Sequence, residues 1–355
     1  MALNLRYPNK DIRENYLRAV EFRYPEWIPC SVNFLPVAWK KHRERLEALV
    51  IRHPLIFGSY EKGNRDFDAM PPVYRGGEHY TDNWGCTWYG VQDGIEGQVV
   101  EHPLEQWSSL ENYQPPDPML KTERGETNWE RSKEIAEERR KNGLLVLGDG
   151  ERLFDRLYFL RGFANLMHDI VRDAPQLPRL IKMLEDHEMR LIDMGLEIRA
   201  DIMSFHTDIG TQRGLMISPG KFREYIKPMF KRLFTRCRDA GIHVYLSSDG
   251  RLLDIVDDLI ECGVSVHDPQ LRANTFEGIA RAYKGKMCVD LDLDRQMFSS
   301  CRPEDIRAQI KEGVKQLSLP EGGLMMKAEI CDASVSLENI EAICQAMKDF
   351  CIGKR

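Results

Sequence analysis

His243-Val-Tyr-Leu-Ser-Ser-Asp-Gly250 is a short apolar run that breaks off into polar residues. Four more runs in the second half of the chain have the same form, ending in the polar groups His206-Thr-Asp208, His267-Asp-Pro-Gln270, Asp290-Leu-Asp-Leu-Asp294 and Glu329-Ile-Cys331. Helix-length stretches with apolar residues three and four apart separate most of these runs. This alternation is typical of parallel α/β proteins and predicts a (β/α)₈ TIM barrel.

The first half of the chain extends this pattern. Residues 27–34 predict the opening strand, and residues 39–51 a helix that ends near His53-Pro54. Residues 144–147 predict a buried strand with a polar end at 148–152, followed by a long helical region over 160–198. Residues 58–120, rich in Gly, Pro and aromatic side chains, predict short strands and loops, and the charged residues 121–142 an exposed helix. We therefore predict one domain over residues 1–355, with an insertion or lid at about 58–142.

Composition narrows the class of protein. The 355 residues are 42% hydrophobic and 30% charged, which is ordinary for a soluble globular protein. A net charge of −6 without a basic block argues against nucleic acid as a partner. The N-terminal residues lack an apolar signal core, and no apolar window is long enough to span a membrane. The nine cysteines have no paired short spacing, so we expect free thiols in the cytoplasm.

The polar strand ends are the candidates for chemistry. In a closed barrel Asp208, Asp249, Glu329 and at least one of Asp290, Asp292 and Asp294 would share one mouth. So many carboxylates cannot all stay ionised in a partly dry pocket. Either a metal or a basic group such as Arg152, Arg161 or Arg295 neutralises them, or one carboxyl stays protonated as a general acid.

Each candidate also has a plain structural interpretation. Asp208 and Asp249 are typical turn residues, and a lone histidine such as His267 is more often structural than catalytic. Asp290 and Asp294 are expected to bind loop backbone. No Gly-x-Ser-x-Gly, Walker, Gly-x-Gly-x-x-Gly or His-Glu-x-x-His motif occurs, which argues against serine hydrolysis, P-loop phosphoryl transfer, dinucleotide binding and zinc proteolysis.

Several motifs occur together along the chain. They are Ile217-Ser-Pro-Gly-Lys-Phe-Arg-Glu-Tyr-Ile-Lys-Pro228, Asp249-Gly250, residues 259–266, residues 82–85, residues 102–104 and residues 337–340. This combination resembles the uroporphyrinogen decarboxylase superfamily. The resemblance spans about residues 12–350 and implies a (β/α)₈ barrel with one of two chemistries. These are cofactor-free decarboxylation of a tetrapyrrole and corrinoid-dependent methyl transfer.

The second chemistry agrees better with the residues present. The decarboxylases carry an N-terminal Arg-Gln-Ala-Gly-Arg signature that is missing from residues 25–33, and an acidic mouth would repel a highly anionic porphyrinogen. In thiol-alkylating methyltransferases of the superfamily a His-x-Cys-Gly motif and a late cysteine bind zinc. Here Ser247 and Asp249 stand at the motif's histidine and cysteine, and Cys331 lies near the late cysteine. A zinc site of Asp249, Glu329 and Cys331 would be harder and weaker than the family's own.

The resemblance implies a substrate-specific methyltransferase, or O-demethylase component, that moves a methyl group from a small methoxylated or methylated compound. The acceptor would be the corrinoid (cobalamin) of a separate partner protein, because no Asp-x-His-x-x-Gly cobalt loop occurs in this chain. Its expected residues are catalytic Asp208, Asp249, His206 and His267, substrate-binding Asn33, Trp84, Gln212, Ser247 and Arg295, and metal-binding Asp249, Glu329 and Cys331.

Two alternatives stay open. One is a cofactor-free decarboxylase acting on a porphyrinogen or a small acid. The other is a non-catalytic binding protein with a degenerate site, which the residues at positions 247 and 249 suggest. The resemblance also allows a homodimer.

Overall fold

The structure is a computed structural model that describes residues 11–122 and 125–353. Its contacts divide the chain into two compact units. Unit 1 is Met1–Glu78, Gly90–Gly97 and Asp268–Arg355, and unit 2 is His79–Tyr89 and Gln98–His267. Residues 1–10, part of the stretch searched for a signal sequence, lie outside the described residues. The prediction of a single domain stays a prediction.

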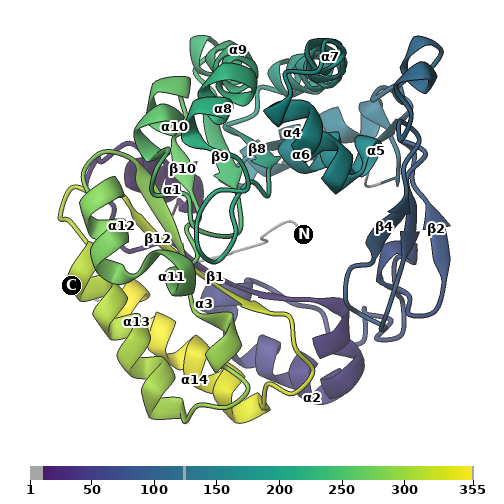
Figure 1. Cartoon of the computed structure of the whole chain (residues 1–355). Helices are drawn as coiled ribbons and strands as arrows, with labels where there is room; N and C mark the ends of the chain where they lie inside the picture. The colour runs from purple at the N-terminus through teal and green to yellow at the C-terminus, as the bar shows by residue number, and fades with distance from the viewer. Residues whose placement is uncertain (1–10, 123–124, 354–355) are drawn as a thin grey trace. The chain divides into compact units, whose positions relative to one another are not determined.

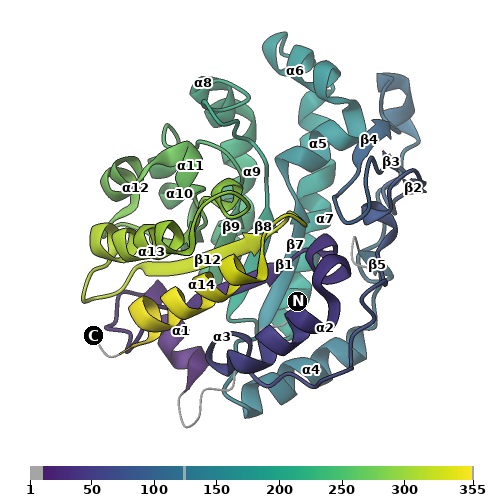
Figure 2. The same ribbon diagram turned by 90° about the horizontal axis from the view of Figure 1, so that it is seen from below.

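Unit 1 contains three parallel strands with β12 (Leu324–Ile330) between β1 (Cys30–Phe34) and β11 (Cys288–Asp292). Five of the seven side chains of β12 are buried, as expected for a parallel strand covered on both faces. The helices of unit 1 include α1 (Ile12–Val20), α2 (Pro36–Arg52), α3 (Pro54–Phe57), α11 (Leu271–Asn274), α12 (Phe276–Tyr283), α13 (Pro303–Leu317) and α14 (Leu337–Met347). Figure 2 shows α13 and α14 side by side, where they pack on one another.

Unit 2 contains four parallel strands, in the order β7 (Leu147–Arg152), β8 (Ile202–His206), β9 (His243–Ser247) and β10 (Val266–His267). Its helices include α4 (Trp129–Lys141), α5 (Phe154–Arg161), α6 (Phe163–Val171), α7 (Leu177–Glu197), α9 (Lys227–Asp239) and α10 (Val256–Cys262). Figure 1 shows α7 and α9 side by side. A separate small sheet has β3 (Thr87–Tyr89) between β2 (His79–Thr81) and β4 (Gln98–Glu101), and both pairings are antiparallel. Seven parallel strands with helical connections confirm the predicted α/β barrel fold class.

Most predicted elements are present. The opening strand and its helix are found as β1 and α2, and α2 ends at Arg52, before His53-Pro54. Most of residues 160–198 is helical, in the end of α5, in α6 and in α7, with breaks at Gly162 and at residues 172–176. Gly162 has a φ of 87°, a left-handed conformation that glycine tolerates. The helix predicted over residues 121–142 begins only at Trp129.

The strand predicted at residues 144–147 was wrongly placed. The strand is β7, Leu147–Arg152, so the residues expected to form its polar end form most of the strand itself. Gly148 and Gly150 explain the shift, because a Cβ atom at Gly150 would lie 2.3 Å from the Phe205 ring and one at Gly148 2.2 Å from the Met203 sulfur. A strand in which glycines make space for neighbouring side chains lacks the continuous apolar run from which a buried strand is predicted.

Two further expectations concern the whole chain. Within residues 11–122 and 125–353, no helix is both long enough and apolar enough to cross a membrane. All nine cysteines are free thiols, and seven of them are buried.

The first turn of α14 offers a test of the unit 1 packing. Asn339 is 5% exposed, and its Nδ2 donates hydrogen bonds to the carbonyl oxygens of Phe298 at 2.7 Å and Cys301 at 3.0 Å. Asn339→Ala leaves these carbonyls without that donor and should lower the free energy of unfolding by about 1–3 kcal/mol. Urea denaturation measures the loss. Gln345→Ala, an exposed position on the same helix, should change it by less than about 0.5 kcal/mol, and equal losses in both variants would contradict the prediction.

Candidate functional site

Polar side chains gather at the carboxyl ends of the unit 1 strands. Asn33 on β1 is the register partner of Glu329 on β12, and Asp292, the last residue of β11, is the partner of Lys327. Arg295 follows β11 in a short helical turn, Arg295–Met297. Parallel pairing therefore brings together residues that are far apart in the sequence.

Asp292 is the central group of this set. Its residue is 1% exposed, and its Oδ2 accepts a hydrogen bond of 2.7 Å from Arg295 Nη2. Among the described residues, none donates a hydrogen bond to Oδ1. Burial raises the pKa of Asp292 to about 7, against the lowering effect of Lys327 and Arg295 and with a further increase from Asp268 and Glu329. Near neutral pH this carboxyl is therefore partly protonated, and its Oδ1 is buried.

Lys327 and Asp268 form a second charged pair beside Asp292. The Lys327 ammonium donates to Asp268 Oδ2, and Asp268 is 2% exposed. Burial alone would lower the pKa of Lys327, but the carboxylates of Asp268, Asp292 and Asp290 hold it above its ordinary range. Lys327 thus stays cationic and compensates part of the buried negative charge.

The unit 1 members of the predicted metal site fit a zinc ion poorly. Glu329 already accepts a hydrogen bond from Arg295 Nη1, which neutralises its charge. Burial raises the pKa of the Cys331 thiol and Glu329 raises it further, although Arg295 opposes both. Zinc binds the thiolate form of cysteine, which these surroundings disfavour. The chemistry proposed below therefore does not involve a metal ion bound by Glu329 and Cys331.

An aromatic cluster begins at the end of β1. Phe34 packs against Trp39 and Phe57, with ring centroids 5.4 and 5.6 Å apart, and Trp39 stacks with Tyr60 at 6.3 Å. The Arg65 guanidinium lies 4.1 Å from the centroid of the Trp39 ring. A cavity of about 820 Å³ adjoins this cluster and is lined by Ser59, Tyr60, Glu61, Asn64, Arg65 and Asp66.

Unit 2 brings together four of the predicted residues at the ends of β8 and β9. His206 is the register partner of Ser247, and Asp208 Oδ1 accepts a hydrogen bond of 3.0 Å from the backbone N–H of Asp249. His206 and Asp249 are exposed, whereas Asp208 and Ser247 are partly buried. The two aspartates therefore hold adjacent loops together, as turn residues do, and still present polar atoms to solvent.

The other predicted residues of unit 2 differ from that group in their exposure and contacts. Gln212 is exposed in the loop after β8, and His267 is fully buried in β10. Trp84 is 1% exposed, with its indole N–H donating to Glu151 Oε2 at 2.8 Å. Its ring packs edge-on against His187, with ring centroids 4.5 Å apart. Its predicted contact with a substrate gains no support from this placement.

The structure also separates residues that the sequence left equivalent. Of the three aspartates at 290, 292 and 294, Asp294 accepts from the backbone N–H of Gln296 at 3.2 Å, which confirms its expected loop-binding role. Asp290 lies inside β11, and its predicted binding of loop backbone stays a prediction. Sequence reasoning did not single out Asp268 and Lys327, although a lysine inside the apolar run Leu324-Met-Met-Lys-Ala328 was a usable signal.

The predicted gathering of all these carboxylates in one cavity stays a prediction. Asp208 and Asp249 belong to unit 2, whereas Asp292 and Glu329 belong to unit 1. Each unit therefore contributes its own polar set.

A solved methyltransferase from Methanosarcina mazei superposes with a TM-score of 0.66 and 16% sequence identity, over 95% of this chain and 98% of that one. A 3-keto-D-glucoside 4-epimerase from E. coli has a TM-score of 0.37 and 13% identity, over 70% of this chain and 95% of that one. At these identities the first likeness shows the fold alone, and the second is too weak to support an argument. No curated protein matches this chain.

The family model described as uroporphyrinogen decarboxylase (URO-D) matches residues 84–350. The match covers most of the chain and includes β7 to β12. It confirms the resemblance drawn from the motifs. The chain belongs to the uroporphyrinogen decarboxylase family.

Proposed function

We propose that this protein is a methyltransferase that moves a methyl group from a small methoxylated or methylated compound to the corrinoid of a separate protein. Family membership and the fold shared with the Methanosarcina mazei methyltransferase support this proposal. The observation that carries it is Asp292, a buried carboxyl with a pKa raised to about 7 at the carboxyl end of a strand.

Asp292 suits the difficult part of demethylation. When a methyl group leaves an ether oxygen, that oxygen keeps the electron pair of the broken C–O bond and is a poor leaving group unless it gains a proton. Asp292 gives its proton to that oxygen, so an O–H bond replaces the O–C bond. Arg295, 2.7 Å from Asp292 Oδ2, stabilises the carboxylate that remains. A corrinoid held by a partner protein would, in its reduced form, supply the electron pair that forms the new bond to the methyl carbon.

The aromatic cluster supports a substrate class. The cavity of about 820 Å³ has room for a single ring, and its lining combines the aromatic Tyr60 with the charged side chains of Arg65 and Asp66. It also belongs to the same unit as Asp292. We therefore favour a methoxylated aromatic compound as the methyl donor.

A decarboxylase of a small acid is the second candidate. Loss of carbon dioxide leaves a carbanion that needs a proton, and a carboxyl with a pKa of about 7 can supply it. The description of the family model favours this reading. Carbon dioxide released from candidate acids without any corrinoid would support it over methyl transfer.

Asp292→Asn tests the proposed acid. Asparagine keeps the shape of the side chain but cannot deliver a proton, so turnover should fall by about 100-fold or more. The assay mixes purified protein, free cob(I)alamin and a panel of methoxylated benzoates, and follows methylcobalamin formation by visible absorption. Glu304→Gln, at an exposed carboxylate of α13, is the control and should keep its turnover. Equal turnover in Asp292→Asn and the native protein would remove Asp292 from the mechanism.

The raised pKa of Asp292 also predicts how stability depends on pH. A carboxyl with a pKa of about 7 when folded and 3.8 when unfolded binds more protons in the folded state between those values. Stability should therefore fall as the pH rises through this window and level off above pH 7. Between pH 5 and 8 the loss is roughly 2–3 kcal/mol, at 1.36 kcal/mol per pKa unit.

Guanidinium denaturation at pH 5, 6, 7 and 8 measures this effect. Asp292→Asn has no titrating group at this position, so its stability relative to the native protein should rise with pH. Parallel pH profiles for the two proteins would contradict the raised pKa.

Asp249 is the residue to test in unit 2. Asp249→Asn removes the charge but leaves the backbone N–H that donates to Asp208. If the carboxylate binds substrate or a cation, turnover in the cob(I)alamin assay should fall by about tenfold or more. Full turnover would show that the Asp249 carboxylate is not part of the working site.

A further inference from the structure

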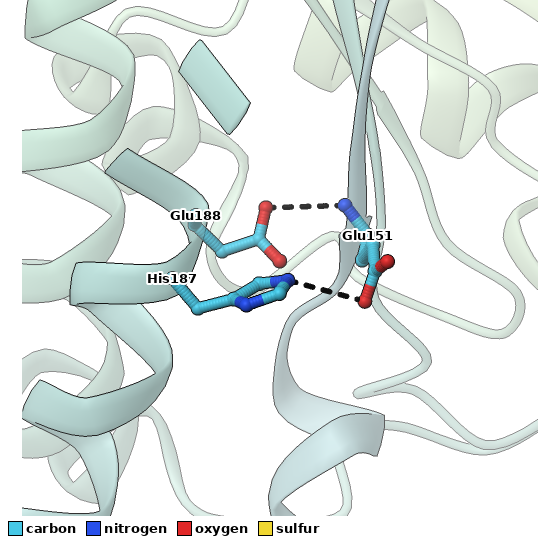
Figure 3. A group of neighbouring side chains, drawn as sticks. All are labelled: Glu151, His187 and Glu188. Atoms are coloured by element: carbon cyan, nitrogen blue, oxygen red, sulfur yellow. Dashed lines mark hydrogen bonds and ion pairs between the residues drawn. The ribbon is translucent and has the colours of Figure 1, made fainter. Parts of the chain in front are cut away.

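Three buried ionisable side chains meet between β7 and α7 in unit 2. Glu151 comes from the strand, whereas His187 and Glu188 come from the helix, and all three point toward one another (Figure 3). Their exposed fractions are 5%, 3% and 0%. One side-chain nitrogen or oxygen from each lies within 4.8 Å of the others. None of the three residues takes part in the function proposed above.

One ring nitrogen of His187, Nε2, is directed into this cluster. His187 Nδ1 lies 3.2 Å from the carbonyl oxygen of Pro116, which can only accept, so Nδ1 carries the hydrogen. In a neutral imidazole, Nε2 is then an acceptor. It faces Glu151 Oε2 at 3.4 Å, and among the described residues it makes no hydrogen bond. An acceptor nitrogen facing a carboxylate oxygen is repulsive unless a cation or a proton lies between them.

The surroundings hold the two carboxylates in place for this arrangement. The Trp84 indole N–H donates to Glu151 Oε2 at 2.8 Å, and Glu188 Oε2 accepts from the backbone N–H of Glu151 at 3.1 Å. Gly150 makes room for Glu188, because a Cβ atom there would lie 2.9 Å from Glu188 Oε2. In metalloproteins, hydrogen bonds of this kind from surrounding residues fix the orientation of the side chains that bind the metal.

Burial makes the charge of the cluster costly. Two carboxylates this deeply buried need positive charge or protonation to stay close together. Arg156, which lies 5.0 Å from the Trp84 ring centroid, brings one positive charge to this neighbourhood but also pairs with Asp82 at 3.0 Å. A divalent cation would compensate both carboxylates and satisfy the imidazole at once.

We propose that Glu151, His187 and Glu188 bind a first-row divalent transition metal. The donor set of two carboxylates and one imidazole suits Zn²⁺ or Co²⁺, with ligand distances near 2.0–2.2 Å that a small contraction of the cluster provides. His187 binds through Nε2, and its Nδ1–H bond to Pro116 fixes the ring orientation. The metal would tie α7 to β7.

A surface cavity provides access to the site. Its volume is about 490 Å³, and its lining includes His187 together with Pro116, Asp117, Met183 and Asp186. The cavity therefore brings solvent to one side of the His187 residue.

Metal binding to the full-length protein tests the proposal. After chelator treatment and dialysis, Co²⁺ titration should show d–d absorption bands of one ion per chain at micromolar affinity, and Zn²⁺ should displace the Co²⁺. A hundredfold excess of Zn²⁺ over its Kd should raise the Tm by roughly 5 °C. Failure to bind either ion below 1 mM would overturn the proposal and indicate a proton shared within the cluster.

Three variants locate the ion. Glu188→Gln and His187→Gln should each weaken Co²⁺ binding by 10-fold or more, because each removes one ligand. Asp186→Asn is the matched control, since this exposed neighbour on α7 lines the same cavity and should leave affinity unchanged. Loss of binding in Asp186→Asn alone would place the ion at the surface and contradict the buried site. If His187→Gln does not fold, Glu188→Gln, which keeps the shape of its side chain, still gives the answer.

Discussion

Parallel hydrogen bonding between β1 and β12 is the constraint on which the unit 1 site depends. It aligns residues 30–34 with residues 326–330, almost the whole length of the chain away. Asn33 thereby lies beside Glu329, and Phe34 beside Ile330. The aromatic cluster around Trp39 begins at Phe34, the last residue of β1, and the register of Asp292 with Lys327 joins the polar group around Asp292 to the same strand β12. Without that register they would be unrelated segments of sequence.

Burial of charge then sets the chemistry of each polar group. Asp292 keeps a raised pKa because its desolvation outweighs the attraction of Arg295 and Lys327. Lys327 shows the opposite balance, because several carboxylates outweigh its own burial. The cluster of Glu151, His187 and Glu188 poses the same problem of negative charge away from water, with an imidazole as the third group. In both places the fold makes ionised carboxyls costly, which gives a proton or a cation a reason to be there.

Strands were predicted correctly from the sequence where an apolar run of side chains corresponds directly to burial. The runs before His206, Ser247 and Glu329 form β8, β9 and β12, because buried parallel strands are almost continuously apolar. The prediction failed at β7, where Gly148 and Gly150 leave space for the side chains of Met203 and Phe205 on the next strand. Trp84 is a similar case. An aromatic residue in a Gly-rich segment suggests a wall for a ligand, but this indole is held inside by Glu151 and His187.

The residue pattern alone was enough to establish the alternation of strands and helices, the barrel fold class and the family, because each rests on local periodicity or short motifs. It also indicated that the crowded carboxyls would need either a neutralising metal or basic group, or one carboxyl that stays protonated. Which carboxyl this is depended on three-dimensional packing: Asp292 differs from Asp290 and Asp294 through its depth of burial and its contact with Arg295. The same holds for His187, whose acceptor nitrogen is defined only by the Pro116 carbonyl, 71 positions away. Desolvation and hydrogen-bond partners are properties of the folded surroundings, and no sequence spacing encodes them.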